Sequence, residues 1–237
     1  MGEKKTLKEK QLVPYVYNYI QDLIFSLKIK SGEKIPEEMI VKELGISRTP
    51  VREALHRLSN DGLINIYPRR FSEVITLTEE DILQLATVRI ALDSLSVQLA
   101  IQFGSNAEFM QLEKLIDECV EAENLGNLND RIKKDTDFHL ILSKISKNKY
   151  LYSMQKSLIL KVRLLLAYKI YENPKYSMPS LETHYKIIKA LYDRDDKEAT
   201  RLMQDHMMEF YGDKDNMLHS LVYGLGRKQD DLLVKIR

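Results

Sequence analysis

Cysteine is nearly missing from this chain of 237 residues, which contains one. A single thiol, Cys119, excludes an intramolecular disulfide and suits a reducing compartment, so we expect a cytoplasmic protein. Stability must then come from a packed core. Apolar residues make up 44% of the chain, which is enough for such a core, and the length indicates two domains.

Long hydrophobic runs are also missing. The most apolar stretch, from Leu158 to Tyr168, is short and is interrupted by Lys161 and Arg163, so we expect no membrane-spanning helix. The first residues lack the apolar segment of a signal peptide. These absences predict a protein that has no membrane partner.

An excess of one charge is missing as well, because 36 Lys and Arg are balanced by 35 Asp and Glu. Residues 1–77 carry a net charge of +3, and residues 78–237 carry −2. A weakly basic N-terminal part is compatible with DNA binding, but it does not by itself indicate DNA binding.

The stretch from Gly45 to Leu58 has the pattern of a turn followed by a helix. Gly45 can adopt the positive φ that a tight turn between helices requires. Ser47 is a suitable N-cap, and Pro50 falls in the first turn, where its missing N–H does no harm. The apolar residues at helical spacing, which we expect to face a core, are Val51, Leu55 and Leu58.

Polar side chains gather on the other side of this helix's N-terminus. Hydroxyls, guanidinium groups and backbone N–H groups at such a position can contact phosphates and guanine edges. The residues concerned are Ser47, Arg48, Thr49 and Arg52. This pattern predicts a DNA recognition helix.

The surrounding sequence predicts a winged helix-turn-helix domain over residues 1–77. The expected elements are helices at 12–27, 37–44 and 47–60 and strands at 63–67 and 73–77. The tip of the hairpin, residues 68–72, contains Arg69 and Arg70, which are candidate phosphate contacts. Three helices followed by a basic β-hairpin define this fold.

Three motifs carry a resemblance to a known family: SGEKIP at 31–36, KELGISRTPVREAL at 42–55 and DGLI at 61–64. With them, residues from about 12 to 77 closely resemble the DNA-binding domain of GntR-family transcriptional regulators. The resemblance implies that Arg48, Thr49 and Arg52 contact bases and phosphates in the major groove, and that Ser47 contacts the backbone. A homodimer on a two-fold operator is expected, because winged-helix regulators usually bind in this way.

Two residues depart from the family's pattern. Met39 stands where many relatives carry a DNA-contacting arginine, so we expect that contact to be absent. Phe71 stands where the wing usually turns on a glycine, which weakens the inference that the tip enters the minor groove. Arg69 and Arg70 keep phosphate contacts at the wing.

Residues 78–237 predict an all-α bundle, because no convincing strand follows residue 77, and the protein as a whole is expected to be mainly α. The expected helices cover 79–103, 106–124, 129–146, 149–172, 178–193 and 196–220. We expect this second domain to supply dimerisation and effector binding.

One predicted helix places Asp135 and His139 four residues apart, so their side chains are separated by about 40° around its axis. His184 and His206 lie on the two following helices. A carboxylate and three imidazoles are a suitable ligand set for a divalent metal ion. Spacing alone does not decide the matter, because such residues also occur as ordinary polar groups of a bundle.

The sequences DTDFH at 135–139, THYKII at 183–188 and MQDH at 203–206 resemble the FCD ligand-binding domain of FadR-type GntR regulators, a resemblance that covers residues 79–220. Many of these domains hold a metal with an Asp-x-x-x-His pair and two later histidines. The resemblance thus implies a divalent metal, zinc ahead of nickel or manganese, on Asp135, His139, His184 and His206. His56 and His219 match no ligand position.

The resemblance also implies an effector, since such domains often bind a small organic acid that reaches the metal and pairs with an arginine. Arg89 occupies the family's position for that arginine. Arg163, a lone charge within an apolar stretch, is a second candidate. A structural ion pair is the alternative role for each.

These observations predict a DNA-binding regulator, not an enzyme, that represses transcription until a carboxylate effector binds. Two alternatives stay open. In the first, the metal is purely structural and there is no effector; in the second, the bundle is a metalloenzyme fused to a DNA-binding domain. No general base follows the ligands in sequence as it does in the His-Glu-x-x-His motif, which argues against the enzyme.

Overall fold

The computed structural model describes residues 9–173, 178 and 180–212. The chain divides into two compact units. One comprises Met1–Thr78 together with Lys156–Lys175, and the other comprises Glu79–Gln155 together with Tyr176–Arg237. The first unit therefore combines the N-terminal residues with a segment from much later in the sequence.

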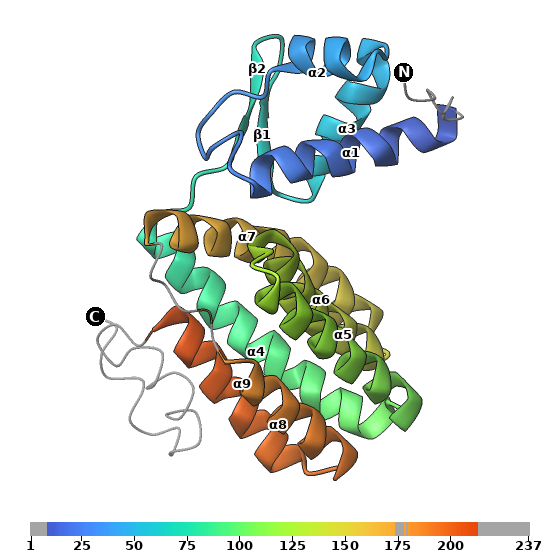
Figure 1. The fold of residues 1–237 in the computed structure, drawn as a ribbon, viewed down its shortest axis with the longest axis vertical. Coiled ribbons are helices and arrows are strands. Elements are labelled where there is room, and N and C mark those ends of the chain that lie inside the picture. The colour runs from blue at the N-terminus through green and yellow to red at the C-terminus, as the bar shows by residue number, and fades with distance from the viewer. Residues whose placement is uncertain (1–8, 174–177, 179, 213–237) are drawn as a thin grey trace, which may run out of the picture. The chain divides into compact units, whose positions relative to one another are not determined.

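The N-terminal unit is a winged helix-turn-helix, as the sequence predicts (Figure 1). Its elements are α1 (Glu9–Phe25), α2 (Glu37–Leu44), α3 (Arg48–Asn60), β1 (Ile64–Tyr67) and β2 (Phe71–Val74). The core face predicted for the recognition helix is confirmed, because the buried residues of α3 include Val51, Leu55 and Leu58. They pack with Ile20 and Ile24 of α1 in one apolar cluster.

The turn between α2 and α3 depends on Gly45, which has φ 64 and lies in the left-handed region. Its N–H donates to the carbonyl of Val41 and closes the end of α2. Ser47 is the N-cap of α3, as expected, but its side chain makes no capping hydrogen bond. The Ser47 hydroxyl is thus not engaged by the helix that it precedes.

The wing differs from its prediction in where the chain reverses. The second strand begins at Phe71 rather than Glu73, and residues 75–77 lie outside it. Arg69 adopts φ 60 and makes the reversal, so Tyr67 and Phe71 are already paired across the hairpin. Residues 32–35 also pair with β2, through hydrogen bonds from Gly32 N to Val74 O (2.9 Å) and from Ile35 N to Ser72 O (2.8 Å).

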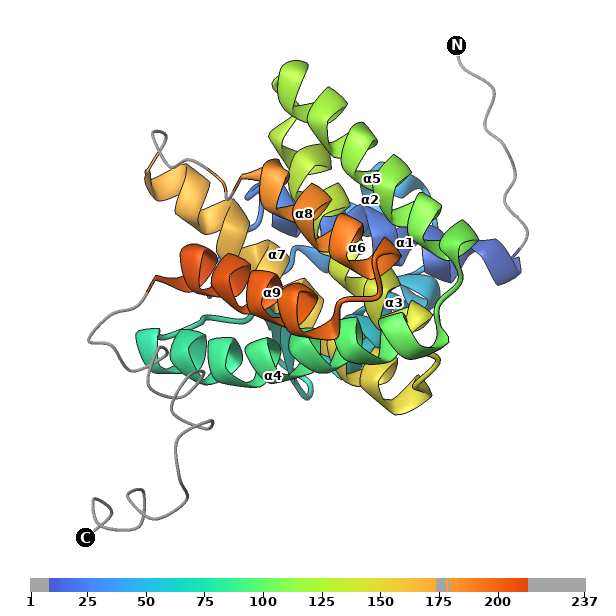
Figure 2. The same ribbon diagram turned by 90° about the horizontal axis from the view of Figure 1, so that it is seen from below.

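The second unit is a helical bundle. Its helices are α4 (Glu79–Phe103), α5 (Asn106–Asn124), α6 (Leu128–Ile145), the first turns of α7 (Lys149–Glu172), α8 (Leu181–Tyr192) and α9 (Asp196–Tyr211). Helix α9 packs beside α4 and α8, and α6 packs beside α4 and α5 (Figures 1 and 2). All six predicted helices are confirmed. Residues 213–220 of the last prediction, and His219, lie outside the described residues.

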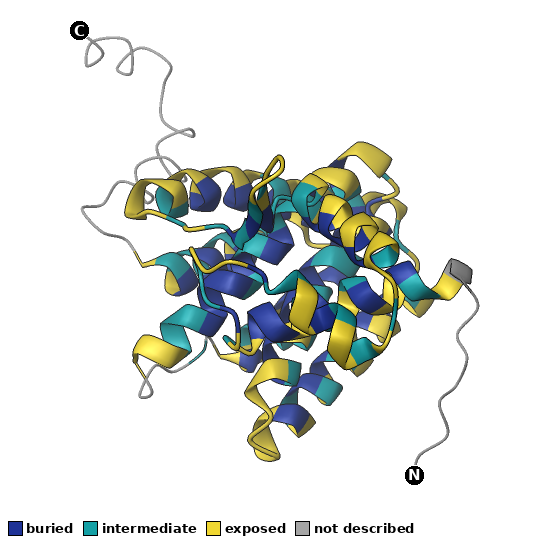
Figure 3. Cartoon of the chain, turned by 90° about the horizontal axis from the view of Figure 1, so that it is seen from above, coloured by how far each residue is buried: buried dark blue, intermediate teal, exposed yellow. Residues whose placement is uncertain are grey.

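Each helix of the bundle carries buried residues on one side and exposed residues elsewhere, and Figure 3 colours the whole chain by this burial. The apolar core includes Val97 of α4, Phe109 of α5, Phe138 of α6 and Ile187 of α8. Burial of these faces supplies most of the driving force for folding. A capping box between Ser105 and Glu108 fixes the start of α5.

Helix α4 corrects one expectation, because by length and composition it is apolar enough to cross a membrane. Its most apolar window of 18 residues has a mean hydropathy of 1.3, and it is the one such helix among the described residues. It also buries two charged side chains, Arg89 and Asp93, which pair with each other inside the bundle. These features are typical of the core helix of a folded domain.

Candidate metal centre and nucleic-acid interface

A groove of about 890 Å³ lies on the N-terminal unit between helices α2 and α3 and the wing. Four of the predicted DNA contacts line it: Arg48, Arg52, Arg69 and Arg70. Ser47 and Thr49 are exposed at the start of α3 but are not part of its lining. Guanidinium groups on both walls give this groove the chemistry that binds phosphates and guanine edges.

Arg48 contacts Glu38 of α2, with 3.2 Å between Nη2 and Oε1, and both side chains are exposed. An exposed ion pair contributes little free energy, so phosphate can replace Glu38 as the partner of Arg48 at small cost. Met39 is exposed in the same groove and contributes no charge to it.

Lys34 is a groove residue that the sequence did not indicate as a DNA contact. Its ammonium lies 4.3 Å from the centre of the Phe71 ring, and that ring packs against Tyr67 with 4.8 Å between centroids. The Tyr67 hydroxyl donates to Glu73 (2.7 Å), which ties the aromatic pair to β2. Phe71 thus supports a cation on the wall of the groove instead of forming the turn of the wing.

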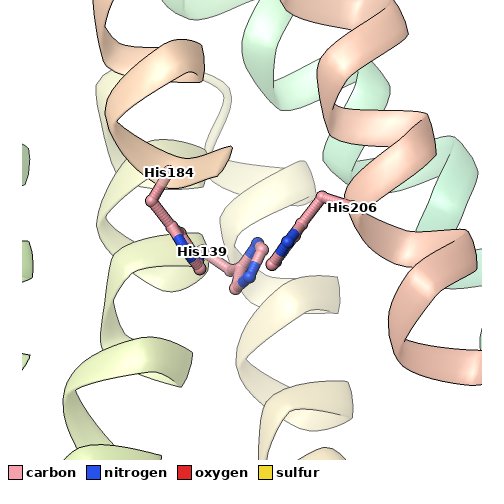
Figure 4. Close-up of side chains that lie close together, drawn as sticks. All are labelled: His139, His184 and His206. Atoms are coloured by element: carbon pink, nitrogen blue, oxygen red, sulfur yellow. The ribbon is translucent and has the colours of Figure 1, made fainter. Parts of the chain in front are cut away.

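The second candidate site is a cluster of three histidines inside the bundle. His139 comes from α6, His184 from α8 and His206 from α9, and their rings point toward one another (Figure 4). One ligand nitrogen from each lies within 4.8 Å of those from the other two. All three side chains are buried. The fold has therefore brought together residues from three helices that are far apart in sequence.

Several ring nitrogens in this cluster are buried without a hydrogen-bond partner: Nε2 of His139, both nitrogens of His184 and Nδ1 of His206. A buried polar atom without a partner is costly, and a shared metal ion would satisfy these atoms together. The three histidines therefore fit a divalent metal ion.

The protonation of the cluster also suits a metal. Burial lowers the pKa of His184 to about 4 and lowers the pKa of His206 well below its ordinary value. Both imidazoles are thus neutral near pH 7, the form that offers a nitrogen lone pair to a cation.

Asp135, the fourth predicted ligand, lies beside the cluster. Its Oδ1 is 3.6 Å from His184 Nε2 and accepts a hydrogen bond from Arg131 at 3.0 Å. Burial raises the pKa of Asp135, but His184 and Arg131 outweigh it and keep the pKa below its ordinary value, so the group is ionised. Arg131 was not among the predicted site residues, although its spacing of four residues from Asp135 is visible in the sequence.

Arg89 lies in the same bundle, with its side chain 2% exposed. It contacts the histidines through Asp93, whose Oδ2 is 3.2 Å from Arg89 Nε and whose Oδ1 is 3.2 Å from His139 Nδ1. Asp93 also accepts a hydrogen bond from Gln155 at 2.9 Å. Neither Asp93 nor Gln155 was among the predicted site residues.

The other arginine proposed for the effector, Arg163, belongs to the N-terminal unit. Its guanidinium lies 4.2 Å from the centre of the Phe25 ring of α1. The structure therefore groups Arg89 with the histidine cluster and does not group Arg163 with it.

The fold and the arginine-lined groove define a winged-helix DNA-binding protein. Residues 12–74 match the family described as bacterial regulatory proteins, gntR family, and residues 84–209 match the FCD domain. The chain belongs to the GntR family of DNA-binding transcriptional regulators and carries an FCD domain.

Individual relatives agree with this assignment. The chain is similar to the HTH-type transcriptional regulator YdhC of Bacillus subtilis, with 33% identity over 139 residues, which cover 58% of this chain and 62% of that relative. It is 25% identical to the transcriptional repressor RspR of Escherichia coli over 194 residues, covering 82% of this chain and 85% of RspR. The family and its members are regulators and not enzymes, so the metalloenzyme alternative is set aside.

Among solved structures, the fold is similar to that of E. coli McbR/YncC, with a TM-score of 0.73 and 21% identity, over 91% of this chain and 98% of that one. At this identity the likeness shows the fold alone. GntR regulators bind operator DNA, generally as dimers.

We predict that Lys34→Ala weakens DNA binding in a way that is independent of sequence. One phosphate contact contributes about 0.9 to the slope of log affinity against log salt, so the slope should become shallower by about that amount. The measurement is a salt titration of operator and unrelated DNA by fluorescence anisotropy. Lys28→Ala, an exposed lysine of the same unit outside the groove, is the control. Equal slopes for both variants would remove Lys34 from the interface.

Proposed function

We propose that this protein is a cytoplasmic, homodimeric repressor whose operator binding is released by a small carboxylate effector at a metal centre in the bundle. The observation that carries the proposal is the cluster of His139, His184 and His206, in which each ring has at least one buried nitrogen without a hydrogen-bond partner. The name of the relative RspR, a transcriptional repressor, supports the sign of regulation.

The proposed ligands are the three histidines and Asp135. Neutral imidazole with one carboxylate is a ligand set that zinc accepts, and nickel and manganese accept it as well. A bound metal would supply a positive charge and open positions for an anionic ligand. Asp135 is held by Arg131, so its carboxylate is already oriented beside His184.

Charge balance supports an anionic effector. The buried side chains that carry full charge among the described residues are two arginines and two aspartates, Arg89, Arg131, Asp93 and Asp135, all in the bundle. These four charges sum to zero, so a divalent cation would leave an uncompensated buried charge of +2. A carboxylate effector would offset part of it, and we propose that Arg89, which reaches His139 through Asp93, pairs with that carboxylate.

The homodimer is proposed to form through the outer face of α4. Every exposed residue of α4 from Gln84 to Phe103 is uncharged, and Val88, Leu95 and Phe103 are large exposed apolar side chains. A run of about five helical turns without an exposed charge is typical of a surface that another protein covers. A second copy of the chain is the partner that a two-fold operator requires.

Replacing Leu95 by Arg places an unpaired charge within this face, and we expect it to shift the protein from dimer to monomer. Sedimentation equilibrium over a range of concentrations measures the change. Leu125→Arg is the matched control, because Leu125 is 75% exposed and lies at the end of α5. A dimer of unchanged affinity in the Leu95→Arg variant would place the interface elsewhere.

Arg52→Ala should weaken specific DNA binding by about 1–3 kcal/mol, because a bidentate contact to guanine contributes that much discrimination. The change should be smaller on unrelated DNA. Arg57→Ala is the control, since Arg57 is exposed on the same helix but does not line the groove. If operator affinity is the same in both variants, Arg52 does not read a base.

The metal centre is tested by elemental analysis of protein purified without chelators or metal-affinity columns, beside His184→Ala. We expect about one metal per chain in the wild type and a large loss in the variant, because one of three imidazole ligands is removed. His56→Ala, which removes an exposed histidine outside the cluster, should keep its metal. Full metal content in His184→Ala would contradict the ligand assignment.

The effector is tested on metal-loaded protein bound to its operator. Small carboxylic acids are titrated in, and release of DNA is followed by fluorescence anisotropy. Release by an acid in the wild type, with a weaker response in Arg89→Lys, supports the proposed pairing. Metal binding without release by any acid indicates the alternative of a structural metal, with no effector.

A further inference from the structure

Asp93 is the most completely buried carboxylate among the described residues, with 0% of its side chain exposed. It lies on α4, whereas the histidines lie on α6, α8 and α9. It is not one of the metal ligands proposed above. Burying an ionised group is costly, so the contacts that justify its position are informative.

The contact of interest joins Asp93 Oδ1 to His139 Nδ1 at 3.2 Å. The other nitrogen of the same ring, Nε2, is buried without a hydrogen-bond partner, and His139 is one of the three clustered histidines. A carboxylate accepts hydrogen bonds and does not donate them, so it favours the tautomer with the proton on Nδ1. In that tautomer the lone pair of His139 is on Nε2.

We propose that Asp93 is a positioning residue for the metal centre: it holds the proton of His139 on Nδ1 and directs the Nε2 lone pair toward the cluster. This inference rests on the metal site proposed above and adds an outer residue to it. Partners of this kind set the tautomer and the ring orientation of metal-binding histidines.

Two further contacts hold Asp93 itself. Gln155 donates to Oδ1 at 2.9 Å, and Arg89 lies on the other oxygen, with 3.2 Å between Nε and Oδ2. Both oxygens are therefore oriented from separate directions, and rotation of the carboxylate would break at least one contact. His139 is in addition stacked on His206, with 5.4 Å between ring centroids and 17° between planes. Its ring is thus fixed both at Nδ1 and on one face.

A purely structural role for Asp93 would require fewer contacts than the structure shows. An ion pair with Arg89 at the spacing of one helical turn would by itself neutralise Asp93 inside the bundle. It would not require Oδ1 to lie against Nδ1 of a clustered histidine whose Nε2 is left without a hydrogen-bond partner.

The first test measures the tautomer in metal-free protein by two-dimensional ¹H–¹⁵N correlation of the histidine rings. In the wild type we expect His139 as the Nδ1–H form. In Asp93→Asn the amide can donate as well as accept, so we expect a mixture of tautomers. A wild-type His139 with its proton on Nε2 would overturn the inference, and this measurement needs no metal.

The second test measures the affinity for Zn²⁺, with no effector present, by competition with a chromophoric chelator. In a separate sample, the absorption spectrum of bound Co²⁺ reports the coordination. Asp93→Asn should bind metal about 10–100-fold more weakly with unchanged stoichiometry, and Asp93→Glu should recover part of the loss. Gln155→Leu removes one hydrogen bond to Asp93 and no metal ligand, so it should show a smaller loss of metal affinity. This variant replaces Asp93→Asn in the test if Asp93→Asn does not fold.

Ser96→Ala is the matched control, because Ser96 is fully buried on the same helix and its hydroxyl donates to its own helix at Leu92 O (2.8 Å). Unchanged affinity in both Asp93→Asn and Gln155→Leu, beside a wild type that binds metal, would overturn the role of Asp93 and leave the metal centre standing. A wild type that binds no metal would overturn the proposed centre, and the tautomer measurement would still test the contact.

Discussion

The structure of the bundle depends on one constraint: polar and charged groups that leave water must find partners inside. Arg89, Asp93, Arg131 and Asp135 meet it in pairs, one pair on α4 and one on α6, each at a spacing of four residues. The three histidines meet it only in part, because burial makes His184 and His206 neutral and leaves nitrogens without partners. Buried imidazole nitrogens without partners, brought together from three helices, are typical of a site that binds a ligand.

Much of the N-terminal fold could be predicted because its information is local. A positive φ at Gly45, an apolar face at helical spacing on α3 and a hairpin pattern each lie within a few residues, and the structure confirms them. The wing was placed less well. The reversal occurs at Arg69, and a sequence pattern does not show which residue of a short tip will adopt a left-handed conformation.

Only some residues of the candidate site could be predicted from the sequence, and the reason is physical. His139, His184 and His206 were identified because the resemblance to a family supplied the pairing that spacing could not. Asp93 and Gln155 were missed because their roles depend on how α4 packs against α6 and against the first turns of α7, which periodicity does not encode. Lys34 was missed for a similar reason, since residues 32–35 reach the wing only through tertiary pairing with β2.

The two candidate sites differ in their electrostatics, and this difference is consistent with the proposed response to a small effector. In the groove, Arg48 is exposed and weakly paired, so DNA bound there would replace Glu38 as its partner at little cost, and binding would be sensitive to salt. In the bundle the charges are buried and balanced, so one added charge has a large effect on the free energy of its surroundings. A ligand that differs in affinity for two arrangements of the helices shifts the balance between them. A buried, charge-balanced cluster is where a small charged ligand obtains the largest such difference.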